Sequence, residues 1–451
     1  MTASLAFAAG AMEGRLLGAD ASFRSVSTDS RTLDAGALFV ALSGPNFDGA
    51  DYLDGAAARG AVGAVVRQSR DSSLPQVVVG DTLQALGRLG SALRERCTKT
   101  TVVGITGSNG KTTLKELTAA CLTRVGNTLA TEGNLNNDIG VPLMLSRIQP
   151  DHDYAVIEMG ANHAGEIAYL AALAKPDVVA LTNAGPAHLE GFGSLDGVSR
   201  AKGELLTVEP RPRVAVLNAD DRYFDYWRQL SRDIDVLSFG FGDAADVQAR
   251  DVSLDSEGSR FALRLPTATI DVRLTLTGEH NVRNACAAAA IAHSLGVSPD
   301  DIAAGLGSVK AVAGRLKARR GKRGARLFDD SYNANPSSVV AAARFLASLG
   351  GRHVFVLGDM KELGPDEVEL TRACGADIRQ AGISRLFAMG ELAEAACDGF
   401  GDGAIRFPDH DALVAALVAE LGAGVNILVK GSRSMAMERV VEPLLADGEV
   451  R

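Results

Sequence analysis

The sequence has little cysteine and no cysteine motif. Its five cysteines are odd in number, widely spaced and free of any Cys-x-x-Cys pair. They stand at Cys97, Cys121, Cys286, Cys374 and Cys397. This distribution argues against a disulfide framework and against a structural zinc site, and it indicates a reducing compartment.

The sequence also lacks an apolar run long enough to span a bilayer, which takes about 20 residues. The apolar segment from Ala3 to Met12 is too short, and no basic segment precedes it as in a signal peptide. We therefore expect this segment to form a packed helix. We expect the protein to be cytoplasmic, with no membrane insertion.

Positive charge is in deficit as well. The 46 Lys and Arg residues against 55 Asp and Glu residues give a net charge of −9, which argues against a nucleic-acid partner. One basic cluster departs from this balance and comprises Lys317, Arg319, Arg320, Lys322, Arg323 and Arg326. Because no aromatic residue is interleaved with it, we interpret the cluster as a solvated loop or strand edge.

The chain is long enough for several domains, and its hydrophobic pattern divides it into three. Short apolar runs bounded by turn residues predict a small mixed domain over residues 1–81, with strands at 37–42, 61–67 and 77–79, a helix at 52–59 and a hinge at 80–81. The other two domains are predicted over residues 82–313 and 314–451.

Strand and helix patterns alternate in both of the larger domains, which predicts an α/β fold with parallel sheets. The central domain has predicted strands at 101–105, 154–158, 178–182 and 214–217, and a period-two alternation over 247–277 that is typical of an antiparallel meander. The last domain, predicted to be doubly wound, has strands at 328–329, 353–357, 385–389 and 426–429.

The strongest local signal is a glycine-rich turn between a strand and a helix, Gly104-Ile-Thr-Gly107-Ser108-Asn109-Gly110-Lys111-Thr112-Thr113. Glycines let the backbone turn its N–H groups toward an anion, and the following helix adds positive potential. Lys111 could reach a β- or γ-phosphate, and a threonine hydroxyl could bind Mg²⁺. We predict that residues 107–113 bind the phosphates of ATP. The spacing is G-x-x-G-K-T-T, because Ile105 stands where the common G-x-x-x-x-G-K loop has its first glycine.

This shorter loop resembles that of the Mur ligase family, and six further segments extend the resemblance over nearly the full length. Five of them are residues 27–31 (STDSR), 44–49 (GPNFDG), 131–140 (TEGNLNNDIG), 330–336 (DSYNANP) and 358–364 (GDMKELG), and a sixth is 430–433 (KGSR). The resemblance implies a three-domain architecture, with a phosphate loop on a central parallel sheet and a doubly wound C-terminal domain. The third-domain segments are most similar to those of the member that adds a dipeptide.

The resemblance implies an activity in peptidoglycan precursor synthesis. That activity joins D-alanyl-D-alanine to UDP-N-acetylmuramoyl-tripeptide, using ATP and two Mg²⁺ ions, and it proceeds through an acyl phosphate. The products are the UDP-N-acetylmuramoyl-pentapeptide, ADP and phosphate. A monomer is expected.

Four side chains are implied to bind metal: Thr112, Glu158, His188 and Lys202. Glu158 ends the apolar strand YAVIE, where a carboxylate suits Mg²⁺. The resemblance further implies that Lys202 reacts with CO₂ to form an anionic carbamate. By sequence alone a single histidine such as His188 is more often structural than a metal ligand, and the spacing around Lys202 favours an ordinary surface lysine. Together with Lys111 and Arg315, the residues Glu158, His188 and Lys202 form the implied catalytic set.

Other residues are implied to bind the nucleotide or the two acceptor substrates. The nucleotide set comprises Asn281, Arg315, Asp330, Tyr332 and Asn333, although Asn281 could instead only cap a helix and the others could form a polar turn. The UDP end of the substrate is assigned to Ser27, Asp29, Ser30, Arg31, Asn46, Phe47, Asp48 and Gly49. The muramyl-peptide is assigned to Asn134, Asn136, Asn137 and Asp138. Weaker candidates for holding the dipeptide are Lys361, Glu362, Ser432 and Arg433.

Four alternatives stay open. The family member that adds the third amino acid commonly has an Asp-Asn-Pro-Arg motif that this sequence lacks. A folylpolyglutamate synthetase would leave the first-domain motifs without a role. A nucleotide-binding regulator would have no need of the catalytic set, and a phosphotransferase would release a phosphorylated product. The sequence does not distinguish lysine from diaminopimelate as the third residue of the tripeptide.

Overall fold

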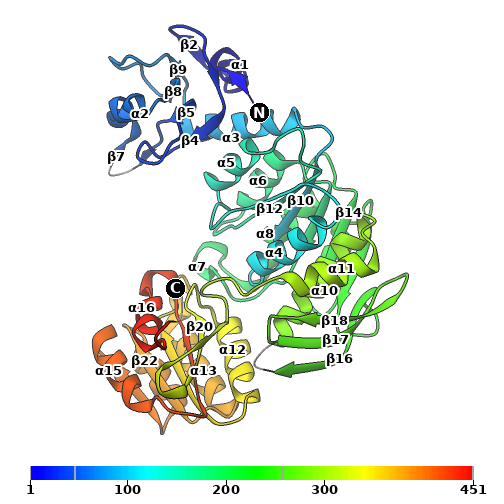
Figure 1. The fold of residues 1–451 in the computed structure, drawn as a ribbon, viewed down its shortest axis with the longest axis vertical. Coiled ribbons are helices and arrows are strands. Elements are labelled where there is room, and N and C mark those ends of the chain that lie inside the picture. The colour runs from blue at the N-terminus through cyan, green and yellow to red at the C-terminus, as the bar shows by residue number, and fades with distance from the viewer. Residues whose placement is uncertain (1, 45–46, 256–257, 449–451) are drawn as a thin grey trace.

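The computed structural model describes residues 2–44, 47–255 and 258–448. Three main sheets of five, nine and six strands follow one another along the chain, and each has its own helices. We call the three parts the N-terminal, central and C-terminal units. They succeed one another down the long axis of the molecule, from blue at one end to red at the other (Figure 1). The α/β fold expected from the sequence is confirmed.

The N-terminal unit is built on a five-stranded sheet with the order β2-β9-β8-β5-β4. Its strands are β2 (Arg15–Leu17), β4 (Ser25–Ser27), β5 (Ala37–Val40), β8 (Gly63–Val66) and β9 (Gln76–Val78), with helices α1 (Leu5–Ala11) and α2 (Leu53–Ala58). Two short ribbons pair β1 (Ala3–Ser4) with β3 (Ser22–Phe23), and β6 (Ser43–Gly44) with β7 (Phe47–Asp48). The expected first helix starts later than predicted, because the Ser4 hydroxyl accepts the Phe7 N–H and caps it at Leu5.

The central unit has a nine-stranded sheet with the order β11-β12-β10-β13-β14-β15-β16-β17-β18. The strands from β11 to β16 are parallel: β10 (Thr101–Thr106), β11 (Thr128–Ala130), β12 (Tyr154–Glu158), β13 (Val178–Leu181), β14 (Val214–Asn218), β15 (Asp235–Gly240) and β16 (Val247–Asp255). β17 (Gly258–Arg264) and β18 (Thr269–Leu274) complete the predicted antiparallel meander.

Helices cover both faces of the central sheet, and an apolar core fills each side. One core holds α4 (Lys111–Leu122), α10 (Glu279–Ser294) and α11 (Pro299–Ser308). The other holds α5 (Gly140–Ser146), α6 (Glu166–Ala174), α7 (Leu189–Phe192), α8 (Leu195–Gly203) and α9 (Phe224–Leu230). The alanine run 285–292 of α10 is fully buried, which lets this helix approach the sheet closely.

The C-terminal unit has a six-stranded sheet with the order β19-β20-β24-β21-β22-β23. Its strands are β19 (Lys317–Arg320), β20 (Arg326–Asp330), β21 (Arg352–Gly358), β22 (Arg385–Met389), β23 (Ala404–Phe407) and β24 (Val425–Lys430). The helices are α12 (Pro336–Ser348), α13 (Glu367–Gln380), α14 (Ala393–Phe400), α15 (His410–Glu420) and α16 (Glu438–Val441). The basic cluster begins on β19, an edge strand as the sequence predicts, but Arg319 in it is buried and not solvated. Among the described residues, no helix is both long and apolar enough to cross a membrane.

Helix α3 (Thr82–Glu95) links the first two units and packs against both. Leu86, Leu89 and Leu93 complete the core of the N-terminal unit, and α3 also contacts α5 and α6 of the central unit. The predicted boundary after residue 81 therefore falls at the start of a shared helix.

Asp81 caps α3, and we expect its replacement to weaken this link. Its carboxylate accepts the N–H groups of Leu83 and Gln84 at 2.8 and 2.9 Å. Asp81→Ala should lower the free energy of unfolding by about 1 kcal/mol, the usual cost of losing an N-cap. Chemical denaturation would measure it, with the exposed Asp71→Ala as the control. An effect no larger than that of the control would contradict this role.

Candidate active site

The carboxyl ends of the parallel strands in the central and C-terminal units face a common region, where two cavities meet. The smaller has a volume of about 370 Å³ and the larger about 520 Å³. Both are lined by Asn109, Arg315, Ser338 and Lys430. Ligands of doubly wound sheets bind at this end of the strands.

The predicted phosphate loop leaves β10 and enters α4, between the two cavities. Gly107 (φ 143°) and Gly110 (φ 83°) have backbone conformations that favour glycine. A Cβ on Gly107 would lie only 1.9 Å from the Thr182 hydroxyl oxygen, so no side chain fits there. The Lys111 ammonium folds back onto the loop and donates to the Gly107 carbonyl at 2.8 Å. Burial lowers the pKa of Lys111, an effect that the Glu158 carboxylate opposes.

Glu158 ends β12 and is 2% exposed. Its Oε1 accepts a hydrogen bond from Asn136 Nδ2 at 2.8 Å, while Oε2 is buried without a partner among the described residues. An unpaired buried carboxylate oxygen is costly unless a cation or donor satisfies it. Glu158 lines the larger cavity, so this free oxygen fits a metal ion beside the phosphate loop.

His188 lines the larger cavity with Glu158, whereas Thr112 lines neither cavity. His188 precedes α7 in a left-handed conformation (φ 54°), lines the larger cavity and contacts the Glu362 carboxylate through Nδ1. Burial lowers the pKa of His188, and Glu362 opposes that shift. The Thr112 hydroxyl accepts from the Arg315 guanidinium at 3.4 Å. Within the described ranges, no group of three or more His, Cys, Asp or Glu side chains is placed so that it could hold a metal ion.

Lys202 lies in α8 and is 2% exposed, so it is not the surface lysine that the sequence left open. Its ammonium donates to the Ala161 carbonyl at 3.3 Å and lies 5.0 Å from the centre of the Phe192 ring. Burial, aided by the nearby Lys111 charge, lowers the pKa of Lys202 to about 7. A substantial fraction of the amine is therefore neutral near neutral pH.

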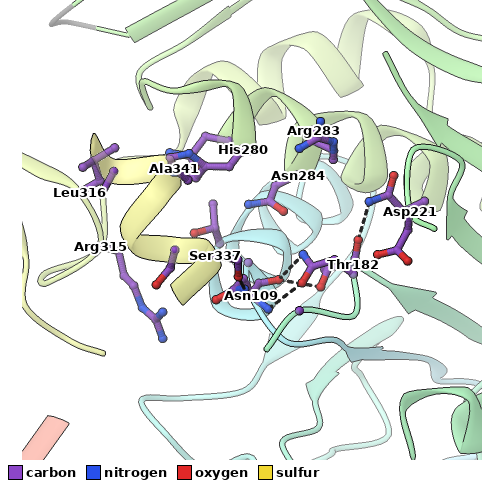
Figure 2. A pocket seen from close by; sticks show the side chains of 18 of the residues that line it. Asn109, Thr182, Asp221, His280, Arg283, Asn284, Arg315, Leu316, Ser337 and Ala341 are labelled. Carbon is purple, nitrogen blue, oxygen red and sulfur yellow. Dashed lines mark hydrogen bonds between the residues drawn. The ribbon is translucent and has the colours of Figure 1, made fainter. Parts of the chain in front are cut away.

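The smaller cavity collects several of the predicted nucleotide residues. Asn281, in the first turn of α10, lines it and donates to the Thr277 carbonyl at 2.8 Å. Asp330 lines it at the end of β20, held by the Lys430 ammonium at 2.7 Å and by the Leu316 N–H at 3.1 Å. Figure 2 shows Arg315 and Asn281's neighbour His280 on the same side of this pocket as Leu316.

Tyr332 and Asn333 are expected to border the nucleotide base, and this stays a prediction. They line the larger cavity, and they are absent from the residues that line the smaller one. The Tyr332 ring instead stacks on the Arg315 guanidinium, 4.0 Å from its centroid. Such stacking holds a guanidinium flat and directs it, so Tyr332 orients Arg315.

Most of the predicted peptide and dipeptide residues line the larger cavity. These are Asn134, Asn136, Asn137, Lys361, Glu362, Ser432 and Arg433. Asp138 instead lines a separate hollow of about 250 Å³ beside Tyr169. The structure thus brings residues of the central and C-terminal units together around one space.

The residues predicted to hold the UDP end lie apart, in the N-terminal unit, and line neither cavity. Asp29 and Arg31 form an exposed ion pair at 2.8 Å, which lowers the pKa of Asp29 to about 2. Ser27 bonds Asp29, and Asp48 bonds Ser43 and Arg70. Phe47 is 54% exposed, and Gly49 is packed so tightly that a Cβ would lie 2.4 Å from the Leu42 carbonyl oxygen. Ser30 is half-buried between Asp29 and Arg31, and Asn46 lies outside the described residues.

Models of three protein domains match this chain in succession. They are the Mur ligase family catalytic domain over residues 22–92, the Mur ligase middle domain over 105–292 and the Mur ligase glutamate ligase domain over 314–433. The chain belongs to the Mur ligase family. The resemblance seen in the sequence is confirmed.

Known Mur ligases similar to this one include the UDP-N-acetylmuramoyl-tripeptide–D-alanyl-D-alanine ligase of Escherichia coli K12. It is 45% identical over 441 residues, which cover 97% of each chain. A crystal structure of MurF from Acinetobacter baumannii matches with a TM-score of 0.93 at 36% identity, covering 98% of this chain and 99% of that one. MurF of Thermotoga maritima in complex with ADP matches with a TM-score of 0.83 at 29% identity, covering 93% and 96%.

Several residues around the phosphate loop of this Mur ligase were missed by sequence reasoning. They are Thr182, Asn183, Asp220, Asp221, His280, Arg283, Asn284, Asn335, Ser337 and Lys430. Thr182 and Asn183 follow β13, and Asp220 and Asp221 follow β14, so the rule that ligands bind at strand ends could have found them. Asn284 lines the smaller cavity, and its buried Nδ2 has no hydrogen-bond partner in the part of the chain that the structure describes. For His280 and Ser337 the sequence gives no comparable signal.

Proposed function

We propose that this Mur ligase joins D-alanyl-D-alanine to UDP-N-acetylmuramoyl-tripeptide at the expense of ATP. The observation that carries the proposal is the position of the phosphate loop, between a cavity lined by Asn281 and Asp330 and a larger one lined by Glu158, His188 and the C-terminal unit. That arrangement suits a nucleotide on one side and an acyl acceptor on the other. The name and 45% identity of the Escherichia coli relative support the choice of substrates.

The reaction needs a leaving group on the tripeptide carboxylate. That carboxylate attacks the γ-phosphoryl of ATP, which gives an acyl phosphate and ADP. Lys111 and Arg315 lie at the loop, where they neutralise charge on the transferring phosphoryl and let two anions approach. The dipeptide amine, once deprotonated, then attacks the acyl carbon, and phosphate leaves as the amide forms.

The C-terminal unit supplies the other wall of the reaction space. Arg433 and Lys361 are cations that suit the dipeptide carboxylate, and Ser432 supports Lys361 by accepting its N–H at 2.8 Å. The acyl phosphate hydrolyses in water. A C-terminal unit that closes over the phosphate loop therefore also protects this intermediate. The exposed Asp29–Arg31 pair and Phe47 of the N-terminal unit would hold the UDP end.

Thr112, Glu158, His188 and Lys202 would hold two Mg²⁺ ions. The Glu158 Oε2, which has no partner among the described residues, supports this assignment, because a hard cation would satisfy it. Bound there, Mg²⁺ would screen the charge of the transferring phosphoryl. We further propose that Lys202 carries a carbamate, because its buried amine is partly neutral and an uncharged amine is the form that reacts with CO₂.

The enzyme is proposed to act as a monomer in the cytoplasm. All five cysteines are free, as suits a reducing compartment. Light scattering on the purified protein would test the monomer.

The test of the function is a reaction with ATP, Mg²⁺, UDP-N-acetylmuramoyl-tripeptide and D-alanyl-D-alanine. Phosphate release and the mass of the nucleotide product are followed together. A product heavier by the dipeptide less water, formed with equal amounts of ADP and phosphate, is the expected result. Turnover only with UDP-N-acetylmuramoyl-dipeptide and a single amino acid would reassign the chain to the third-residue ligases. Nucleotide binding without turnover on either set would indicate a regulator.

Glu158→Gln should lower kcat by about 100-fold and raise the Mg²⁺ concentration needed for half-maximal rate. The amide keeps the size of the side chain and can keep the Asn136 contact by rotation, so the loss isolates the negative charge. Magnesium titrations at saturating substrates would measure both effects. Glu394→Gln, a surface change in the C-terminal unit, is the control. An unchanged Mg²⁺ requirement in Glu158→Gln would remove Glu158 from the metal site.

A further inference from the structure

Asn109 stands in the middle of the phosphate loop, yet protein groups occupy all of its polar atoms. Its N–H donates to Asn183 Oδ1 at 3.0 Å. Its carbonyl accepts from the Thr182 hydroxyl at 2.6 Å and from Asn183 Nδ2 at 3.1 Å. The backbone of Asn109 is therefore tied to the loop that follows β13, and its N–H is not available to a phosphate.

The side chain of Asn109 reaches across to the C-terminal unit. Its Oδ1 accepts from Asn335 Nδ2 at 2.7 Å, and its Nδ2 donates to the Ser337 hydroxyl at 2.9 Å. Figure 2 shows Asn109 with Thr182 to one side and Ser337 on the neighbouring helix. These bonds join residues more than 200 positions apart in the sequence, so they exist only when the two units are in contact.

The partner residues are themselves held rigidly. Asn335 caps α12, accepting the Ser338 N–H at 3.0 Å and the Ser337 hydroxyl at 3.0 Å. Asn335 is 9% exposed, so its amide has little freedom to turn toward water. Gly185 leaves room for the approach, because a Cβ there would lie 2.9 Å from the Ser337 oxygen.

We propose that Asn109 is the docking residue of the phosphate loop, through which Asn335 and Ser337 position the loop when the C-terminal unit closes. Asn109 then acts as a positioning residue and does not bind phosphate itself, contrary to what its place in the motif suggests. The inference rests on the proposed ligase function for its role in turnover. The docking contact itself is independent of which substrates are joined.

Two single changes and their combination test the proposal. Asn335→Ser keeps an oxygen that caps α12 well but has no amide to reach Asn109. Asn109→Ala removes the other half of the contact. Each should lower kcat/KM for ATP roughly tenfold, as for the loss of one or two neutral hydrogen bonds. The double variant should be little worse than either single one, since both remove the same interaction.

Asp409→Ala is the matched control. Asp409 caps α15 in the same unit by accepting the Ala412 N–H at 2.8 Å, and it lines neither cavity. It therefore reports what the loss of a helix cap alone does to the enzyme. Its kcat/KM for ATP is expected to stay within twofold of the unchanged protein.

Two further readouts separate docking from a merely structural effect. Looser closure admits water, so Asn335→Ser should release more than one phosphate for each amide formed, whereas the Asp409→Ala control keeps a ratio of one. Small-angle X-ray scattering of the full chain with a non-hydrolysable ATP analogue should show a larger radius of gyration in Asn335→Ser and Asn109→Ala. Scattering requires no ligation, so it reports on docking even if the proposed substrates were wrong.

The opposite pattern would overturn the proposal. If Asn109→Ala weakened binding of the ATP analogue while Asn335→Ser left kcat/KM and the radius of gyration unchanged, Asn109 would be a phosphate ligand. Losses in kcat/KM that simply add in the double variant would likewise show that the two residues act separately.

Discussion

Lys111→Ala is expected to lower kcat by about 10³-fold or more, with a smaller change in KM for the UDP substrate. Cationic groups at a transferring phosphoryl contribute effects of this order. Lys111 lines the larger cavity, near the Glu158 and Arg315 charges, and burial lowers its pKa. The measurement is phosphate release together with the mass of the product at saturating substrates.

The exposed Lys99→Ala serves as the control for Lys111. It removes one positive charge just before β10, away from the loop, and should leave kcat unchanged. The Lys111 variant should also keep its unfolding midpoint, because its ammonium bonds only loop carbonyls and carries a cost of burial. If Lys111→Ala had a lower unfolding midpoint than the unchanged protein, loss of structure would account for its loss of activity. The role of Lys111 would then be tested with Lys111→Arg, which keeps the charge but changes the geometry.

Lys202→Met is expected to lower kcat by at least about 100-fold while leaving the fold intact. The side chain is buried against Phe192 and Ala161, where methionine is of similar length and has no charge to bury. Replacing a buried charged group by an apolar one of similar volume is often neutral or stabilising. In Lys202→Met, kcat should therefore fall while the unfolding midpoint stays the same or rises.

The dependence of the rate on CO₂ provides a second control for the Lys202 prediction. The unchanged enzyme should lose rate in buffers stripped of CO₂ and regain it with bicarbonate, whereas Lys202→Met should respond to neither. Lys202→Arg should behave like the methionine variant, because a guanidinium stays charged and does not form a carbamate. Full activity of the unchanged enzyme without CO₂ would reject the carbamate and leave Lys202 a positional role.

Some features of the site could be predicted from the sequence and others could not. The phosphate loop was predicted from contiguous residues because its geometry is local: glycine conformations, a strand before it and a helix after it. Glu158 was found in the same way, as a polar residue ending an apolar strand. Short strands such as β4 and β11, of three residues each, carry too little pattern to be seen.

Tyr332 and Asp138 illustrate the limit. Both belong to segments that were assigned correctly to the family, yet Tyr332 lies against Arg315 on the larger cavity, and Asp138 lines a different hollow from Asn136 and Asn137. A sequence motif identifies the segment that lies near a site, to within a few residues along the chain. Which way its side chain faces depends on what packs beside it.

Periodicity, glycine placement and strand ends are properties of neighbouring residues, so the α/β fold, the glycine-rich loop after β10 and the family could be predicted from the sequence. The burial of Lys202, the Glu158 oxygen without a partner among the described residues, and the bonds from Asn109 to Asn335 and Ser337 became visible only in the folded chain. Those facts depend on separate sheets coming together across more than 200 residues of chain. Burial and pairing at such distances follow from the packing of whole units, which no local pattern encodes.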